Sequence, residues 1–287
     1  MNYENAIEVK KLTKKFGDYG VENINFSLPK GYVMGFVGKN GAGKTTTIKS
    51  ILNLVNKDAG EIKVFGLDHL EYEAQIKSKL GIVMDSPFFE GAWTLKTIEK
   101  VMKPFYQTWD SKKYFEMLYY FNLDPHKKLD QLSRGMKMKI MIAVALAHDP
   151  DLLILDEPTS GLDAVARDEL LEALKMFIIN ENKSILFSTH ITSDLEKIAD
   201  YITFINDGEI MHSDTKDNLL EKYVIIKGDF NKLSSEHKKL LIGYNQTAFG
   251  YDAMVLRENI KKLPDEIIIE PATLDDMVIR FNRRKNI

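Results

Sequence analysis

The sequence predicts an α/β fold, in which buried strands alternate with helices. Residues 33–37 form a short apolar run that leads into a glycine-rich segment and then into helical spacing. Residues 152–155 are four consecutive aliphatic residues that close on two acids, as a buried parallel strand would. A further aliphatic run at 184–188 ends at Thr189 and His190. We therefore expect a parallel sheet whose strand ends carry polar side chains.

Composition excludes several classes of site and partner. Lys and Arg number 39 against 42 Asp and Glu, so the net charge of −3 offers no bulk attraction to nucleic acid. The chain has no cysteine, which excludes disulfides, thiol nucleophiles and cysteine metal sites. Its longest apolar run, residues 140–147, is far shorter than the roughly 18 residues that a membrane span requires. Because the N-terminus also lacks an apolar signal core, we expect a chain that is soluble by itself.

The chain begins with two alternating segments, at 7–9 and 24–28, on either side of a turn-rich stretch at 17–20. This pattern predicts an antiparallel pair of strands that leads into the first buried strand. Phe16 lies at the edge of the pair, where its ring could stack on an adenine face or belong to the core. The residues around Phe16 leave both alternatives open.

Residues 38–46 follow the first buried strand and fit the pattern G-x-x-x-x-G-K-[ST], which cradles phosphate groups. The glycines let successive backbone N–H groups point at a phosphate, and the positive end of the following helix adds to the attraction. Lys44 then reaches the outer phosphates, and Thr45 supplies a hydroxyl that can bind Mg²⁺. A plain glycine turn is the structural alternative. The strand before the segment and the helical spacing after it favour nucleotide binding.

Two further strands are expected at 61–66 and 81–84, and the second of them ends at Asp85. From residue 88 to residue 131 the chain becomes helical and rich in aromatic residues. We expect a small helical subdomain with its own core, although a few of these rings could instead form a docking surface.

Ser133 is a natural N-cap for the helix that follows it. Such a helix start can also bind an anion, but capping alone is the simpler interpretation. Residues 160–163 form another turn, which leads into a helix expected at 164–177.

Asp156 and Glu157 close the second buried strand, and alternation along the strand would send them in different directions. Asp156 can hold Mg²⁺ through its hydration shell, and Glu157 can orient and deprotonate a water aimed at a terminal phosphate. Two acids at a strand end could instead be ordinary solvated turn residues. The phosphate-binding pattern earlier in the chain argues against that alternative.

The features described above resemble, in their order along the chain, the motifs of ABC-transporter ATP-binding subunits. They are the glycine loop, the strand-end residue Asp85, the helix start at Ser133, the paired acids, the turn at 160–163 and the strand-end His190. The likeness spans residues 5 to about 215. It implies a P-loop NTPase fold with a RecA-like core, an antiparallel β subdomain and an α-helical subdomain. It places Asp85 at the Q-loop position, and the signature at 132–136. The residues that it implies for ATP binding are Phe16, Gly38, Asn40, Gly41, Ala42, Gly43, Lys44, Thr45, Thr46, Ser133, Arg134, Gly135 and Asp163. Glu157 and the switch histidine His190 would be catalytic, and Thr45, Asp85 and Asp156 would be the metal residues.

The resemblance also implies partners and cofactors. Two ATPase subunits, identical or homologous, would pack head to tail, so that the signature of one covers the ATP and Mg²⁺ held by the other's Walker A loop, which is the segment at 38–46. Asp163 would close the D-loop, which is the turn at 160–163. A separate integral membrane subunit takes the energy of ATP hydrolysis, which would hold this chain peripherally at the cytoplasmic face of the cell membrane. No nucleic-acid partner is expected.

Three residues depart from the usual pattern of the family. Asp85 replaces a glutamine, Arg134 replaces a usual glycine of the signature, and Met136 replaces its final glutamine. Asp85 adds a negative charge beside the phosphates and is expected to modulate metal coordination. Arg134 adds a cation near the partner's ATP, where it could strengthen closure of the dimer or point into solvent.

This form of the signature resembles the ABC-2 exporter branch, which includes drug, bacitracin and phenol-soluble-modulin exporters. The expected function is therefore ATP hydrolysis that drives export of peptides or drugs. A non-transport ABC clamp that acts on DNA or ribosomes is the rival class, but the long coiled-coil insertion and the second ATPase unit of such clamps are missing here. A nucleotide-binding regulator that barely hydrolyses ATP is a further alternative.

We expect the ATPase domain at 1–220, with its helical subdomain at about 86–135, and a small α+β accessory segment at 221–287. Strands are expected in the accessory segment at 223–226 and 267–269, followed by an amphipathic helix after Thr273. The segment could pad the ATPase, assist dimerisation or bind a regulator. Its basic end could meet lipid head groups but is expected to be a solvated tail, with Arg280, Arg283, Arg284 and Lys285.

Overall fold

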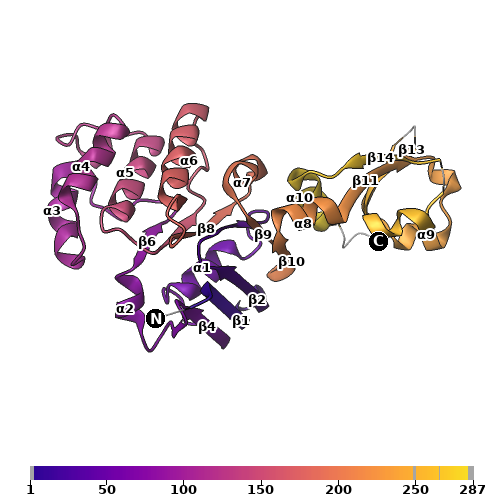
Figure 1. Ribbon diagram of the computed structural model, residues 1–287, viewed down its shortest axis with the longest axis horizontal. Helices are drawn as coiled ribbons and strands as arrows, with labels where there is room; N and C mark the ends of the chain where they lie inside the picture. Colours follow the sequence, from indigo (N-terminus) through magenta and orange to yellow (C-terminus); the bar gives the residue numbers. More distant parts are fainter. Residues whose placement is uncertain (1–2, 248–249, 265, 284–287) are drawn as a thin grey trace.

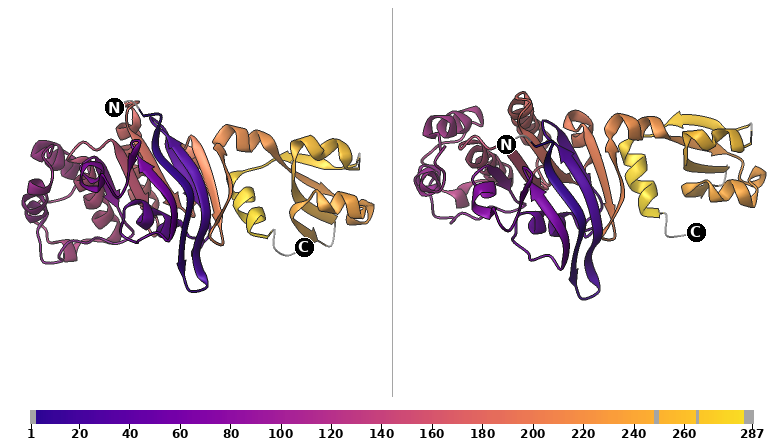
Figure 2. Two further views of the ribbon diagram at one scale, coloured as in Figure 1. Left: turned by 90° about the horizontal axis from the view of Figure 1, so that it is seen from below. Right: turned by 60° about the horizontal axis from the view of Figure 1, so that its bottom comes forward.

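The computed structural model describes residues 3–247, 250–264 and 266–283, and it contains three sheets. Figure 1 shows an elongated molecule in which a helical part and a C-terminal sheet lie at opposite ends. The two views of Figure 2 agree with this arrangement, and the first two sheets lie between the ends. No helix in the described ranges is long and apolar enough to span a bilayer.

The first sheet is antiparallel, with the strand order β2-β1-β4-β5. Its strands are β1 (Asn5–Phe16), β2 (Tyr19–Pro29), β4 (Ala59–Val64) and β5 (Leu67–Asp68). The expected N-terminal pair is confirmed, because Ile7 lies opposite Leu28. The hairpin is longer than expected and continues until Phe16 lies opposite Tyr19. Three register shifts interrupt the pairing, which hides the alternation of this segment in the sequence.

The second sheet is mostly parallel and has the order β10-β9-β3-β8-β7-β6. Its strands are β3 (Val33–Val37), β6 (Leu80–Val83), β7 (Leu152–Asp156), β8 (Ser184–Thr189), β9 (Tyr201–Asn206) and β10 (Glu209–Thr215). β8 lies between β3 and β7, so that Val37 pairs with Thr189 and Asp156 with Ser188. The carboxyl ends of three neighbouring strands therefore meet at one edge, where ligands bind in open α/β sheets.

Helices cover this sheet and extend from it. They are α1 (Lys44–Ile51), α2 (Glu73–Lys77), α3 (Leu95–Met102), α4 (Ser111–Tyr120), α5 (Arg134–Leu146), α6 (Ala164–Ile178) and α7 (Thr192–Ile198), with short 3₁₀ turns at Lys103–Phe105 and Leu129–Gln131. The helical part does not have a core of its own, contrary to expectation. Tyr114 of α4 belongs to the same buried cluster as Leu153 of β7, because the aliphatic helix α5 connects the two.

The third sheet is antiparallel, with the order β12-β13-β11-β14. Its elements are α8 (Lys216–Lys222), β11 (Tyr223–Gly228), α9 (Ser235–Lys239), β12 (Ile242–Thr247), β13 (Gly250–Leu256), β14 (Ile268–Pro271) and α10 (Leu274–Arg283), with 3₁₀ turns at Phe230–Lys232 and Arg257–Lys262. The expected strands and the final helix are present, and β12 and β13 are additional.

The basic end of the chain is not simply a solvated tail. Arg280 is only 7% exposed, and its guanidinium forms an ion pair with Asp252 of β13. Its position on α10 faces the sheet, so the charge is buried against a carboxylate. Arg284 and Lys285 lie outside the described residues.

Candidate nucleotide site

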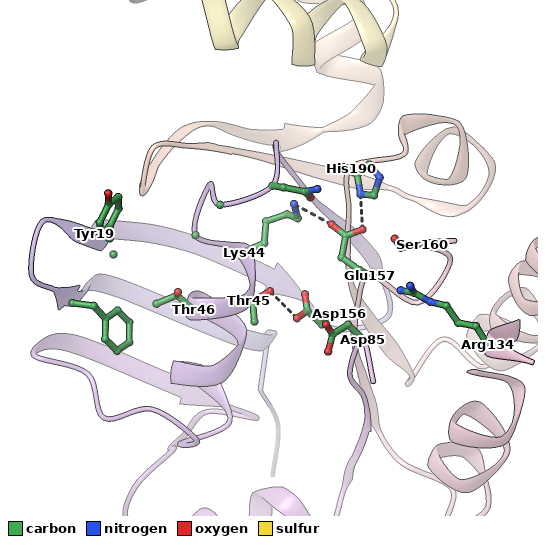
Figure 3. A pocket seen from close by; sticks show the side chains of 15 residues that line it. Tyr19, Lys44, Thr45, Thr46, Asp85, Arg134, Asp156, Glu157, Ser160 and His190 are labelled. Carbon is green, nitrogen blue, oxygen red and sulfur yellow. Dashed lines mark hydrogen bonds and ion pairs between the residues drawn. The ribbon is translucent and has the colours of Figure 1, made fainter. Parts of the chain in front are cut away.

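A pocket of about 380 Å³ lies at the carboxyl edge of the parallel sheet (Figure 3). Most of the predicted site residues line it, and three further residues join them. The lining consists of Phe16, Tyr19, Gly20, Asn40, Gly41, Gly43, Lys44, Thr45, Thr46, Asp85, Arg134, Asp156, Glu157, Ser160 and His190. Gly38 and Ala42 are buried behind this surface. Ser133, Gly135 and Asp163 do not line the pocket.

The glycine loop can take its shape only with small residues. Gly43 has a φ of 110°, and a Cβ atom there would lie 2.5 Å from a methyl group of Val21. A Cβ on Gly38 would lie 2.2 Å from the carbonyl oxygen of Ile205. These clashes explain why glycine is needed at the two positions, since the loop is pressed against β9 and the first sheet.

Lys44 is buried at the centre of the loop, with 5% of its surface exposed. Its Nζ donates hydrogen bonds to the carbonyl oxygens of Gly38, at 2.7 Å, and Lys39, at 3.2 Å. The same atom lies 3.0 Å from Oε1 of Glu157. A buried ammonium with three oxygen neighbours satisfies its charge inside the protein and is directed at the pocket.

Thr45 and Asp156 form the floor of the site. Thr45 Oγ1 donates a hydrogen bond of 2.8 Å to Oδ2 of Asp156, and Ser188 Oγ donates one of 2.6 Å to Oδ1. Asp156 is almost fully buried, so these two donors hold its carboxylate in place. Asp85 is exposed at the rim and has no hydrogen bond or ion pair within the described residues.

Glu157 follows the last residue of β7 with a φ of 52°, in the left-handed region. This conformation breaks the alternation of the strand, and both acids reach the same pocket instead of pointing apart as expected. Its N–H donates to the carbonyl oxygen of Ser188 at 3.1 Å, which helps to hold the bend. Left-handed backbone at a non-glycine residue costs about 1–3 kcal/mol and is concentrated at functional sites.

His190 completes the arrangement at the end of β8. Its Nδ1 lies 2.7 Å from Oε2 of Glu157, while Lys44 approaches Oε1 from the other side. Figure 3 shows the two basic groups converging on the one carboxylate. Glu157 and His190 directly follow the neighbouring strands β7 and β8, and Lys44 opens α1 after the glycine loop.

Two aromatic rings stand at the opposite end of the pocket. Phe16 is 51% exposed and Tyr19 is 81% exposed, so Phe16 is not a core residue. The two residues face each other across the tip of the β1–β2 hairpin. Exposed rings beside a polar pocket suit a flat aromatic ligand.

The residues of the expected signature lie on the far side. Ser133 Oγ accepts a hydrogen bond from the N–H of Met136 at 3.2 Å and caps α5, and Asp163 caps α6 in the same way. Arg134 alone extends to the pocket, and Figure 3 shows its guanidinium directed toward Ser160. Its Cζ lies 3.4 Å from where a Cβ of Gly161 would be. The guanidinium therefore packs against the backbone of Gly161, which has no side chain at this point.

Comparison with known proteins decides the family. The ABC transporter family matches residues 21–160. The chain is 32% identical to the bacitracin transport ATP-binding protein BcrA of Bacillus licheniformis, over 75% of this chain and 72% of that protein. It is 33% identical to the lantibiotic transport ATP-binding protein SrtF of Streptococcus pyogenes, over 76% and 95%. The chain belongs to the ABC transporter ATP-binding family. A solved ATP-binding subunit of an ABC transporter matches with a TM-score of 0.68 and 28% identity, over 75% of this chain and 91% of that chain.

The chain is thus an ABC ATPase subunit that binds and hydrolyses ATP, and its fold is the predicted P-loop NTPase fold. Sequence reasoning missed Tyr19, Gly20 and Ser160 in the lining of the pocket, and Ser188, which holds Asp156. Tyr19 could have been noticed as a second aromatic residue three positions after Phe16. Ser188 carries no motif of its own, and only strand pairing brings its hydroxyl to Asp156.

Proposed function

We propose that this pocket holds one ATP, with adenine against the hairpin rings and the phosphates in the loop at 38–46. The observation that carries the proposal is the convergence of Lys44 and His190 on Glu157, at 3.0 and 2.7 Å. Lys44 is itself part of the glycine loop, and the backbone N–H groups of this loop suit an anion. When triphosphate enters, its oxygens replace Glu157 as the partner of Lys44. Oε1 of Glu157 then becomes available to a water molecule.

We propose Glu157 as the group that orients and deprotonates the attacking water. Proton transfer of this kind requires the base within hydrogen-bond reach of the water and beside the terminal phosphate. Because His190 is bonded to Oε2, Oε1 is the carboxylate oxygen that becomes free once the triphosphate takes over Lys44. The imidazole is then also placed where it can contact the γ-phosphate. Both roles follow from the position of the two side chains at adjacent strand ends.

Mg²⁺ fits the other side of the same pocket. Thr45 and Asp156 supply hard oxygen donors that are already 2.8 Å apart, and exposed Asp85 adds a third at the rim. The described residues contain no cluster of three or more acidic or histidine ligands, which agrees with an ion that keeps most of its water and shares the nucleotide. The bound ion would neutralise charge on the phosphates. Thr45 and Asp156 are the residues that we propose to hold it.

We propose that a second ATPase subunit, identical or homologous, completes the site. Ser133, Gly135 and Asp163 lie outside the pocket of their own chain, although their hydroxyl, backbone and carboxylate groups suit a nucleotide. In a head-to-tail dimer these residues cover the ATP of the facing subunit. Solved relatives include a dimeric bacterial ABC transporter cassette, 25% identical over 73% of this chain and 98% of that chain, with a TM-score of 0.64.

We propose that the dimer drives a separate membrane subunit of an exporter, at the cytoplasmic face of the membrane. The relatives named for bacitracin and lantibiotic transport support peptide or drug export. Phe88, three residues after Asp85, is 61% exposed and is one of the rings available for docking, together with Phe105, Tyr119 and Tyr120. Phe89 and Trp93 are buried or partly buried instead. The segment at 221–287 is proposed as an accessory unit attached to an ATPase domain at 1–220.

Steady-state ATP hydrolysis by Glu157→Gln tests the proposed base. We expect kcat to fall by about 100-fold or more, because glutamine keeps the size of the side chain but cannot accept a proton. Binding of a fluorescent ATP analogue should remain within about threefold, since the phosphate loop is untouched. Glu116→Gln, which removes an exposed acid on α4, is the matched control and should hydrolyse ATP normally. Wild-type turnover by Glu157→Gln would refute the assignment.

A further inference from the structure

The helix that follows His190 is connected to the C-terminal unit. Thr192 is the first residue of α7, only two positions after His190, and its side chain is buried. Its Oγ1 donates a hydrogen bond to the carboxylate of Asp275, in the first turn of α10. Figure 1 places α7 and α10 next to each other, at the junction of the two ends of the molecule. One hydrogen bond thus joins the C-terminal unit to the helix that follows His190.

The same helix is anchored to the loop that carries Glu157. Asp194 of α7 is fully buried, and it accepts a 2.6 Å hydrogen bond from Thr159, two residues after Glu157. Arg167 of α6 pairs with the other oxygen of Asp194. The start of α7 is therefore held by the catalytic loop on one side and by α10 on the other.

The other end of α10 is fixed to the third sheet. Buried Arg280 donates a 2.7 Å hydrogen bond to the carbonyl oxygen of Gly243, beside its ion pair with Asp252. Gly243 has a φ of 57°, and a Cβ there would lie 2.6 Å from the Cα of Arg280. α10 can therefore pass a movement of the third sheet directly to α7.

His190 needs such support. Its side chain is 40% exposed, so packing does not fix the ring. Its ring contact is the bond to Glu157, and its backbone is positioned by β8 on one side and by α7 on the other. A small shift of α7 would change the distance between the imidazole and Glu157, and shifts of about 1 Å can cost 100-fold in rate.

We propose that Asp275 is a positioning residue that acts through Thr192 on His190, so that the C-terminal unit sets the rate of ATP hydrolysis. The inference rests on the proposed role of His190. It gives the segment at 221–287 a regulatory role. Any partner that moves α10 would change the rate of ATP hydrolysis without contacting the nucleotide.

The test compares kcat and KM for ATP in purified full-length variants. We expect Thr192→Val and Asp275→Ala each to lower kcat by about tenfold, which is the weight of one hydrogen bond to a charged group, with KM unchanged. Thr192→Ser and Asp275→Asn keep a donor and an acceptor and should recover most of the rate. The double variant Thr192→Val with Asp275→Ala should be no slower than either single variant, because both remove the same bond.

Asp276→Asn is the matched control. It removes the same charge from the next position of α10, while asparagine still accepts the hydrogen bonds that Thr273 donates to Asp276. We expect its kcat to equal that of the wild type. Thermal unfolding of each variant identifies loss of fold, and Thr192→Val, which keeps the shape of the side chain, carries the test if Asp275→Ala does not fold.

The outcomes separate this inference from its premise. Wild-type turnover by His190→Gln would overturn both the role of His190 and the inference. Loss of turnover in His190→Gln, together with wild-type kcat in Thr192→Val and Asp275→Ala, would overturn the inference alone. A changed KM with constant kcat would also overturn it, because Val278 of α10 lies beside Gly38 and would then act on the phosphate loop.

Discussion

Glu157 shows how much the site depends on the backbone at one residue. The motif identifies two successive acids, but strand alternation predicts that they point apart. The φ of 52° at Glu157 turns both acids into one pocket. A local motif does not encode this bend, because the hydrogen bonds that hold it come from Ser188 on the neighbouring strand.

Arg134 gives a prediction at the residue scale. Its guanidinium is exposed, rests against Gly161 and has no hydrogen bond or ion pair in the part of the chain that the structure describes. We therefore expect it to be available to the ATP of the facing subunit in a dimer. Arg134→Gly should weaken ATP-dependent dimerisation of a hydrolysis-deficient chain by about tenfold, measured by sedimentation, because a charge-assisted bond is lost.

The control for Arg134 is Lys112→Ala, which removes another exposed cation, from α4. It should dimerise like the parent chain. Unchanged dimerisation and unchanged turnover in Arg134→Gly would mean that the guanidinium only points into solvent.

At the scale of elements, His148 joins the end of α5 to the parallel sheet. It is 2% exposed, its ring stacks on Tyr106 at 3.9 Å, and its Nε2 lies 3.0 Å from the carbonyl oxygen of Leu80. Burial lowers the pKa of His148 below its ordinary value of 6.5. The folded state therefore binds this proton less well than the unfolded state.

The sign of the resulting pH dependence follows from linkage. The free energy of unfolding does not depend on the protonation of His148 above the unfolded-state pKa of 6.5, where the imidazole is neutral in both states. It decreases as the pH falls from there toward the lower pKa of the folded state. Relative to His148→Gln, the wild type should lose up to about 1.4 kcal/mol of unfolding free energy per pH unit below that point. Urea denaturation at pH 7.5, 6.5 and 5.5 measures the difference. Parallel curves for the two proteins would contradict the assignment.

The elements that the sequence predicts well are those whose burial is uniform. Val33–Val37 and Leu152–Asp156 are buried at every position. Their apolar runs can therefore be recognised in the sequence without knowing which strands lie beside them. Several strands were not foreseen, among them β9, β10, β12 and β13. β10 is only partly covered, and β12 reads Ile-Gly-Tyr-Asn-Gln-Thr. In both cases the strand forms by pairing with a neighbour, β9 or β13, rather than through its own pattern.

At the scale of the whole molecule, the ordered motifs predict the ABC family and the residues of the pocket, but they do not predict how α10 meets α7. That contact joins positions 83 residues apart through a threonine and an aspartate that belong to no motif. Packing of the C-terminal unit on the ATPase part brings them together. The proposed ATP-dependent dimer also belongs to this scale, because Ser133, Gly135 and Asp163 lie outside the pocket of their own chain and would act on the ATP of a second one.

The most direct test of the account is the molecular mass of Glu157→Gln in solution, by light scattering, with and without ATP and Mg²⁺. The account predicts a monomer without nucleotide and a dimer of twice the mass with it, because ATP bound in each pocket is covered by the signature of the other chain. Adding Lys44→Ala should abolish the dimer, since the phosphate loop then loses its cation. A monomer under every condition, at concentrations where ATP occupies the pocket, would contradict the central claim.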